Sequence, residues 1–301
     1  MERLVVIHIE DVTKYFGSFA GVNDISLDVF SGEIFGFLGP NGAGKTTTIR
    51  MLLDLLRPTA GQIYLFGKQI KGHSEEIRKK CGYLPGSFSA YGNLTGLEFL
   101  RFCAALRGIG GNPGAELAER FELSGQSLER KIKYLSHGTA QKLGIVQAFF
   151  HRPELLILDE PTIGLDPLMQ EEFYRLLEER RREGATTFLS THNLGEVERV
   201  CHRMAIIRNG RIETKDTIEN LRKILRKKII LTLSHPVGEL KLAEAELVKH
   251  EGLTYEFLLG RNIGKTLQEL SALPVADLTI PEPGLEEIFI NFYKEKDEDH
   301  D

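Results

Sequence analysis

The sequence predicts an α/β fold, because buried strands and helices alternate along most of the chain. The apolar run 34–38 indicates a buried strand, and 46–56 indicates a helix with its apolar residues on one face. A second apolar run, 155–158, ends in two acids and is typical of a buried parallel strand. Residues 90–150 show mainly helical patterns, so we expect an all-helical subdomain inserted between strands of the α/β core.

Both ends of the chain carry further elements. Alternating apolar residues predict strands over 4–10 and 21–29, before the 34–38 strand. The pattern changes near residue 221, and we expect a small α/β appendix over 223–294 with a charged, disordered tail over 295–301. The elements expected in the appendix are strands over 254–259 and 277–280 and helices over 263–270 and 285–293.

Composition limits the classes of function. The chain has 301 residues, 42% of them hydrophobic, which suffices for a full core and a second, smaller unit. Its net charge of -5 gives no bulk attraction for nucleic acid. No signal peptide and no apolar run of about 18 residues is apparent, so we expect a soluble, cytoplasmic protein. Three widely spaced cysteines favour free buried thiols in a reducing compartment: Cys81, Cys103 and Cys201.

The glycine-rich turn after the 34–38 strand fits the phosphate-loop pattern. Its residues are Gly39, Pro40, Asn41, Gly42, Ala43, Gly44, Lys45, Thr46 and Thr47. Glycines let several backbone N–H groups point at one anion, and the following helix adds its positive end. Lys45 can reach terminal phosphates and Thr46 can ligate Mg²⁺. An ordinary glycine-rich turn is the alternative, but every required position is filled in a strand–turn–helix context. We therefore expect the chain to bind a nucleotide.

Polar residues at two other strand ends complete this predicted site. Asp159 and Glu160 follow the 155–158 strand, and His192 follows a strand over 186–191. Ligands of open α/β sheets lie at the carboxyl ends of the strands, which places all three residues beside the phosphate loop. Asp159 suits a Mg²⁺ shell and Glu160 suits the polarisation of an attacking water. The alternatives are acids at a solvated strand end and a histidine that only makes structural hydrogen bonds.

With these motifs in order, residues 3–220 resemble the ATP-binding subunit of an ABC transporter. The phosphate loop matches the family's Walker A, 155–160 matches Walker B with Glu160 as catalytic glutamate, and His192 matches the switch histidine. Residues 161–166 look like the D-loop. The resemblance implies a P-loop NTPase core with a mixed or parallel sheet, an N-terminal antiparallel β subdomain and a helical insertion. It also implies an ABC ATPase domain over 1–222.

The resemblance assigns two further parts of the nucleotide site. Phe16 aligns with the aromatic that stacks on adenine, and Tyr15 is the neighbouring option. Residues 135–139 occupy the position of the signature motif. Two subunits of this family face each other head to tail, so Ser136 and Gly138 would contact the ATP held by the other subunit. ATP and Mg²⁺ are the implied cofactors.

Two departures from the family pattern concern this site. The usual signature is Leu-Ser-Gly-Gly-Gln, but His137 and Thr139 replace its first Gly and its Gln. The family's Q-loop Gln is also absent, because Gly86 stands at that position and Ser87 follows it. We expect activity to persist, since the Walker residues and His192 are present. A backbone carbonyl, a water, or pairing with a different ATPase subunit could compensate.

The resemblance implies two protein partners. These are a second ATPase subunit, identical or different, and an integral membrane permease, which places the chain at the inner face of the cell membrane. The segment 283–289 is similar to C-terminal extensions of exporter-type subunits linked to drug or antibiotic resistance, which can aid dimerisation. A non-transport ABC ATPase acting on nucleic acid or ribosomes is the alternative, although such proteins usually carry two cassettes. A phosphate-loop kinase or GTPase is disfavoured by the signature and by His192.

Overall fold

The computed structural model describes residues 4–88, 91–111, 114–224, 227–238, 240–260 and 263–281. The chain divides into two compact units between Thr217 and Ile218, five residues before the boundary expected at 222. The expected helix 285–293, the 283–289 segment and the tail 295–301 lie outside the described residues. Each unit is described by itself below.

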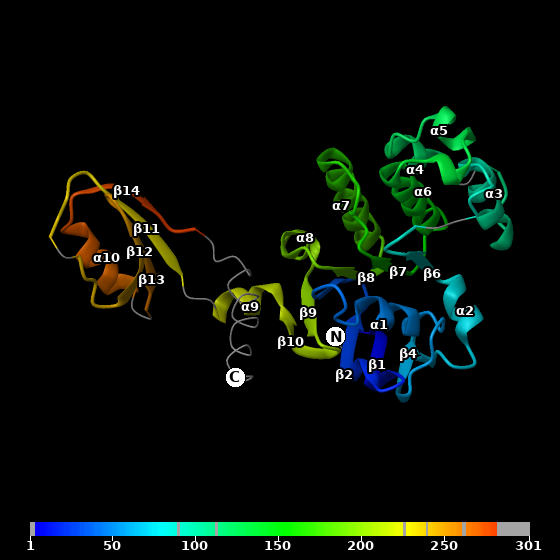
Figure 1. The fold of residues 1–301 in the computed structure, drawn as a ribbon, viewed down its shortest axis with the longest axis horizontal. Coiled ribbons are helices and arrows are strands. Elements are labelled where there is room, and N and C mark those ends of the chain that lie inside the picture. Colours follow the sequence, from blue (N-terminus) through cyan, green and yellow to red (C-terminus); the bar gives the residue numbers. More distant parts are fainter. Residues whose placement is uncertain are drawn as a thin grey trace. The chain divides into compact units, whose positions relative to one another are not determined.

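The larger unit is built on a six-stranded mixed sheet (Figure 1). The strand order is β10 (Arg211–Thr217), β9 (Arg203–Arg208), β3 (Ile34–Leu38), β8 (Thr186–Thr191), β7 (Leu155–Asp159) and β6 (Cys81–Leu84). All neighbours pair in parallel except β10, which is antiparallel to β9. Every residue of β3, β7 and β8 is buried, as expected for central strands covered on both faces. β10 had not been predicted, because its polar sequence lacks an apolar pattern.

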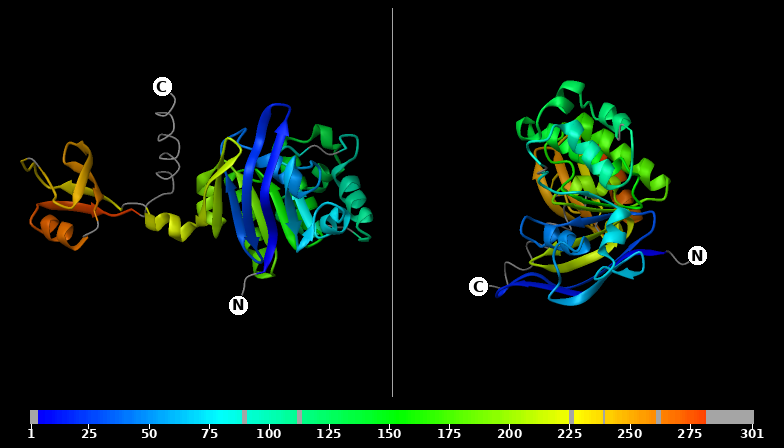
Figure 2. Two further views of the ribbon diagram at one scale, coloured as in Figure 1. Left: turned by 90° about the horizontal axis from the view of Figure 1, so that it is seen from below. Right: turned by 90° about the vertical axis from the view of Figure 1, so that its right-hand side faces the viewer.

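A second, antiparallel sheet lies on the other side of this core from the helical insertion, as Figures 1 and 2 show. Its order is β2 (Phe19–Phe30), β1 (Val5–Phe16), β4 (Ala60–Leu65) and β5 (Lys68–Gln69). Helix α1 (Lys45–Leu52) shares one hydrophobic core with both sheets, through Ile49 and Leu52. The helix ends at Leu52 rather than at the predicted residue 56, because Asp54 adopts a left-handed backbone conformation (φ 53°) that stops it.

In its described residues, the predicted helical insertion has four helices and a 3₁₀ turn. They are α3 (Gly96–Leu106), α4 (Ala115–Arg120), α5 (Gly125–Glu129), the turn Ile132–Tyr134 and α6 (His137–Phe149). Helix α3 begins with a capping box, in which Thr95 and Glu98 satisfy each other's backbone N–H groups. A separate apolar cluster that includes Phe99 and Val146 holds these helices together. A short helix, α2 (Ser74–Lys79), precedes β6.

Two helices follow the strands that carry the predicted site. Helix α7 (Pro167–Arg182) begins at Pro167, because Asp166 caps its N-terminus and Pro167 fits the first helical position. The Asp166 carboxylate accepts a hydrogen bond of 3.0 Å from Met169 N. Helix α8 (Leu194–Val200) follows β8 and packs against β3, β8 and α7.

The smaller unit contains α9 (Ile218–Ile224), α10 (Ile263–Ser271) and an antiparallel sheet. The sheet order is β12 (Ala245–Glu251), β13 (Thr254–Leu259), β11 (Lys228–Leu233) and β14 (Val275–Thr279). Its core contains Leu231, Phe257 and Leu270. The sequence predicted β13, α10 and β14 within a few residues but missed β12, whose residues are nearly all exposed.

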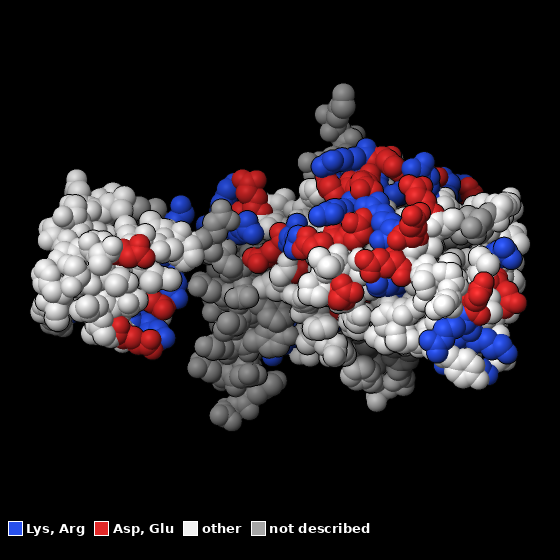
Figure 3. Space-filling view, turned by 90° about the horizontal axis from the view of Figure 1, so that it is seen from above, with Lys and Arg blue, Asp and Glu red and all other residues white. Residues whose placement is uncertain are grey.

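Charged side chains of both signs are intermixed over the face of the larger unit seen in Figure 3. Ion pairs within or next to α7 include Arg181–Glu178 and Arg199–Glu171. None of the helices in the described ranges has the length and apolar character needed to cross a bilayer.

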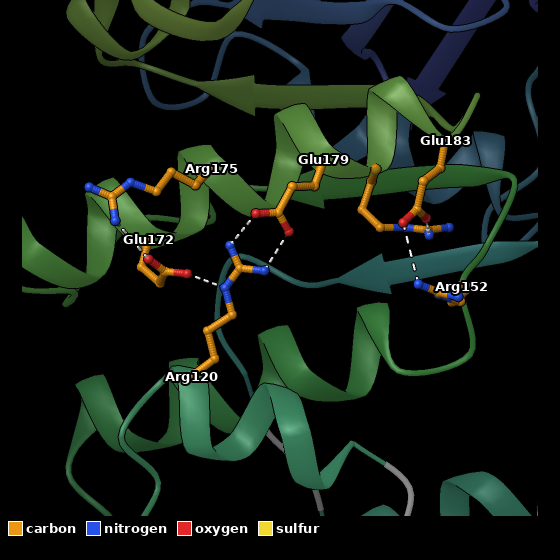
Figure 4. A network of polar contacts seen from close by, with 7 residues as sticks. Arg120, Arg152, Glu172, Arg175, Glu179 and Glu183 are labelled. Carbon is orange, nitrogen blue, oxygen red and sulfur yellow. Dashed lines mark hydrogen bonds and ion pairs between the residues drawn. The ribbon is translucent and has the colours of Figure 1, made fainter.

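One ion-pair network joins the helical insertion to α7 (Figure 4). Arg120 at the end of α4 donates to both carboxylate oxygens of Glu179, at 2.5 and 2.9 Å, and also pairs with Glu172. Glu172 in turn accepts from Arg175 on its own helix. The network therefore connects two parts of the unit that the chain places about 50–60 residues apart.

Candidate active site

The predicted site residues gather at the carboxyl ends of β3, β7 and β8, three neighbouring parallel strands. A pocket of about 330 Å³ lies at this edge. It is lined by Phe16, Phe19, Gly21, Pro40, Asn41, Gly42, Gly44, Lys45, Thr46, Thr47 and Glu160. The position agrees with the rule that open α/β sheets bind ligands beyond the carboxyl ends of their strands.

Two glycines of the loop are required by its geometry. Gly44 precedes α1 with φ 110°, and a Cβ there would lie 2.7 Å from the carbonyl oxygen of Gly21. A Cβ on Gly39 would lie 2.3 Å from the carbonyl oxygen of Ile207. Larger residues would push the loop away from these strands. The loop is therefore held close to the sheet, and the N-terminus of the eight-residue helix α1 borders the pocket.

Lys45 is buried, with 5% of its surface exposed, and its ammonium group is held by the loop itself. Its Nζ donates to the carbonyl oxygens of Gly39 at 2.6 Å and Pro40 at 3.2 Å. It also lies 3.2 Å from Oε1 of Glu160, with which it forms an ion pair. A buried cation with this arrangement is positioned to exchange protein oxygens for phosphate oxygens.

Asp159 is the centre of a second polar group. Its Oδ2 accepts a hydrogen bond of 2.7 Å from Thr46, and its Oδ1 accepts one from Ser190. Gly86, which the sequence resemblance assigns to the Q-loop position, lies close to this group, because a Cβ on it would be 3.3 Å from Asp159 Oδ2. The sequence had not singled out Ser190, which lies two residues before the predicted His192 on β8.

Glu160 lies between Lys45 and His192. Its Oε2 accepts a hydrogen bond of 2.9 Å from Nδ1 of His192, while its Oε1 faces Lys45. The carboxylate is 13% exposed, and the His192 side chain is 51% exposed. The backbone of Glu160 adopts φ 49°, a left-handed conformation that is unusual for a non-glycine residue. The orientation of this carboxylate is therefore fixed by a strained backbone and by its contacts with Lys45 and His192.

Sequence reasoning missed a buried carboxyl group beside this pair. Glu196 on α8 is 2% exposed, and burial raises its pKa to about 7, with a further contribution from the charge of Glu160. The hydroxyls of Thr191 and Thr162 lie beside the carboxyl and lower its pKa, although neither makes a well-aligned hydrogen bond to it. Its position four residues after His192 gave no signal, because a lone glutamate on a short helix is normally exposed.

Exposed aromatic rings form one wall of the pocket. Phe16 is 48% exposed and lines the pocket. Tyr15 is not among the lining residues, because successive side chains of a strand point to opposite faces of the sheet. The Phe16 ring lies over Gly21, where a Cβ would come within 2.8 Å of it. Phe19, which is 65% exposed, is a second ring in the lining that the sequence had not singled out.

The signature residues lie at the N-terminus of α6 and are absent from the pocket lining. Ser136 caps the helix, since its Oγ accepts from Thr139 N at 3.2 Å and lies 2.8 Å from Thr139 Oγ1. Gly138 approaches the D-loop so closely that a Cβ would lie 2.5 Å from the carbonyl oxygen of Gly164. Within one chain, the signature and the phosphate loop are therefore separate.

Comparison with known proteins identifies the family. The ABC transporter family profile matches residues 22–163. The chain is 36% identical over 296 residues to the bacitracin transport ATP-binding protein BcrA of Bacillus licheniformis, covering 95% of this chain and 96% of that protein. It is also similar to a solved ATP-binding subunit of an ABC transporter (32% identity, TM-score 0.68, 73% of this chain and 92% of that one).

A further solved structure, described as the dimeric structure of MJ0796, a bacterial ABC transporter cassette, shares the fold at 24% identity and a TM-score of 0.65. It covers 70% of this chain and 98% of that one. These likenesses confirm the predicted fold class, in which a P-loop core carries an antiparallel subdomain and a helical insertion. The chain therefore belongs to the family of ABC transporter ATP-binding subunits, which are ATPases.

Proposed function

We propose that this chain binds ATP at the phosphate loop and hydrolyses it with Glu160 as general base, to power a separate membrane permease. The observation that carries the proposal is the position of the Glu160 carboxylate between Lys45 and His192 at the mouth of the pocket. Lys45 and the loop amides would bind the phosphates. Glu160 would accept a proton from the attacking water, and His192 would orient the Glu160 carboxylate.

Thr46 and Asp159 fit a Mg²⁺ ion that accompanies ATP. Their oxygens lie 2.7 Å apart at the edge of the loop, and one hydroxyl with one carboxylate is the protein contribution expected when phosphates and waters supply the remaining ligands. Bound there, Mg²⁺ would neutralise charge on the phosphates. The Ser190 hydroxyl holds the other oxygen of Asp159 and would keep the carboxylate oriented.

The role of Glu160 is tested by Glu160→Gln, which keeps the shape of the side chain but removes the base. We expect ATP binding to persist and turnover to fall by a factor on the order of 10²–10⁴. Glu154→Gln is the matched control, because Glu154 lies just before β7 and pairs with Lys80 at the strand's other end. Near-normal turnover by the Glu160 variant would overturn the assignment.

We further propose that ATP is enclosed between two copies of the cassette, with Ser136 and Gly138 contacting the partner's γ-phosphate. Support comes from the position of both residues at the start of the 13-residue helix α6, away from the phosphate loop of their own chain. A mixed dimer of Ser136→Arg and Lys45→Ala subunits should keep one intact composite site and retain activity that neither homodimer shows. Mixed dimers as inactive as both parents would contradict this arrangement.

A groove in the larger unit is suited to the permease. It has a volume of about 630 Å³ and lies between β6 and the helical insertion, where apolar side chains such as Leu55, Tyr91 and Phe99 line it. Leu55 and Tyr91 are 59% and 66% exposed, so an amphipathic helix of the permease would bury them. We expect Leu55→Glu to reduce co-purification of the permease, while Leu4→Glu, at an exposed leucine outside the groove, should not. Equal retention by both variants would exclude this groove.

A relative that matches nearly the whole chain supports a proposal for the cargo. A protein named for bacitracin transport shares 36% identity over 95% of this chain, which supports a permease that exports a peptide antibiotic. The chain would then act at the cytoplasmic face of the cell membrane. A strain that expresses the chain with its permease should tolerate more bacitracin than a strain that carries Glu160→Gln. Equal susceptibility of the two strains would count against this cargo.

A further inference from the structure

Gln141 is a fully buried polar side chain to which the proposed function gives no role. It lies in the second turn of α6, and none of its surface is exposed. Its Nε2 donates to the carbonyl oxygen of Pro161 at 2.9 Å and lies 3.5 Å from that of Glu160. One amide therefore contacts two successive backbone carbonyl groups, those of Glu160 and Pro161.

The hydrogen-bond network fixes the orientation of this amide. A flipped side chain would set its oxygen against two carbonyl oxygens, both of which can only accept. In the observed orientation Oε1 has no donor within the described part of the chain. The Gln141 NH₂ group therefore binds the loop, while the Gln141 carbonyl oxygen is left without a hydrogen bond from the described residues.

The backbone at Glu160 needs such support. Its φ of 49° lies in the left-handed region, and the next residue, Pro161, has no N–H with which to anchor the turn. The other bonds are Glu160 N to the Ser190 carbonyl at 2.9 Å and a longer one from Ile163 N to the Glu160 carbonyl at 3.4 Å. Among the described side chains, Gln141 thus holds the carbonyl groups of Glu160 and Pro161, next to the backbone from which the Glu160 carboxylate projects.

The helix that carries Gln141 begins at the signature. Ser136 caps α6 five residues before Gln141, a rise of about 7.5 Å along the helix. The first turn also contacts the D-loop through Gly138, beneath the Gly164 carbonyl. Helix α6 therefore contacts the loop after β7 at two points. A displacement of the helix would move the backbone of Glu160, because the Gln141 amide connects the two.

We propose that Gln141 is a positioning residue for ATP hydrolysis, which sets the direction of the Glu160 carboxylate by binding the carbonyl groups of Glu160 and Pro161. It touches neither substrate nor the reacting atoms. Its contribution is geometric, because a small rotation of this peptide moves the carboxylate away from the attacking water. The inference rests on the proposed role of Glu160.

The test uses the full-length chain and two substitutions of Gln141. Gln141→Met keeps the size of the side chain and removes the donor. We expect kcat to fall by roughly tenfold or more, while the Kd for ATP stays within about twofold of the original. Gln141→Glu cannot donate when ionised, but its protonated form can donate to the Pro161 carbonyl. Its kcat relative to the unmodified protein should therefore rise as the pH falls from about 8.5 to about 6.

Arg180→Met is the matched control. Arg180 is a buried residue on α7, whose guanidinium donates to the Pro153 carbonyl at 3.3 Å, near the other end of β7. This variant also loses a buried bond to a backbone carbonyl, but it should keep the original kcat once folded, as judged by its melting temperature. A similar loss in Arg180→Met and Gln141→Met would show that the effect is general destabilisation and would overturn the proposal.

The remaining outcomes are equally decisive. An unchanged kcat in Gln141→Met, a parallel loss of kcat and ATP affinity, or a pH-independent ratio for Gln141→Glu would each refute the positioning role. Failure of the Glu160 assignment is recognised separately, because Glu160→Gln would then remain active. If Glu160→Gln is inactive and Gln141→Met is fully active, only the present inference fails.

Discussion

Replacing Glu196 with Gln should stabilise the larger unit at alkaline pH. The carboxyl group is 2% exposed, and no well-aligned hydrogen bond reaches either of its oxygens from the described residues. Burial is the main cause that raises its pKa from 4.5 to about 7, and the Glu160 charge adds to it. This pKa is lowered by the hydroxyls of Thr191 and Thr162 and by His192, but their combined effect is smaller than the effect of burial.

The magnitude follows from linkage between proton binding and folding. Each pKa unit corresponds to about 1.4 kcal/mol, so a rise from 4.5 to about 7 means that the ionised carboxylate costs the folded state about 3 kcal/mol. The folded protein holds the proton more tightly than the unfolded chain. Stability is therefore unaffected by this group below about pH 4.5, falls between about pH 4.5 and pH 7, and carries the full penalty above that range.

The substitution Glu196→Gln removes the titrating group with little change in the shape of the side chain. The neutral amide can donate to the threonine hydroxyls, and it carries no charge at any pH. We expect the free energy of unfolding to gain about 2–3 kcal/mol more at pH 8 than at pH 5, relative to the unmodified chain. For a unit of this size, the gain corresponds to a rise in melting temperature on the order of 5–10 °C at pH 8.

The assay is thermal unfolding of both proteins, followed by calorimetry at about pH 5 and about pH 8. Glu75→Gln is the control, because Glu75 is exposed on α2 and pairs with Lys79 of its own helix, so its removal should stabilise the protein at neither pH. The reasoning is refuted if Glu196→Gln shifts the melting temperature equally at both pH values, or if it lowers the melting temperature at pH 8.

Three further predictions concern the nucleotide site and the helical insertion. Lys45→Ala should abolish measurable ATP binding in isothermal titration, because it removes the buried cation beside the loop carbonyls; unchanged binding would show that the loop is not the site. Phe16→Ala should weaken ATP binding at least about fivefold by removing a stacking ring, while Tyr15→Ala should not, and the reverse order in the same titration would reassign the base contact. Arg120→Met should lower the melting temperature by about 2–4 °C, since its pairs with α7 are partly exposed and are together worth about 1 kcal/mol. Arg182→Met, at a side chain that is 72% exposed, serves as its control, and equal shifts would show that the network adds nothing.

Elements with strong local signals were predicted well. The apolar runs 34–38 and 155–158 identified β3 and β7. Elements without such signals were misplaced or missed. The strand β10 is polar because it lies at the edge of the sheet and none of its residues is buried, and α1 ended early because the chain turns at Asp54. For β10 the deciding contacts, its pairs with β9, come from outside the local pattern.

The sequence by itself determined the chemistry of the site, because phosphate loops and acids at strand ends are local motifs whose residue types follow from their ligands. The strand order was decided by tertiary structure, and it brings Thr46 within 2.7 Å of Asp159, 113 residues further along the chain. Tertiary structure alone also placed Gln141 against the Pro161 carbonyl and buried Glu196 beside Glu160. Burial and hydrogen bonding across such separations depend on how helices pack on the sheet, which no local pattern records.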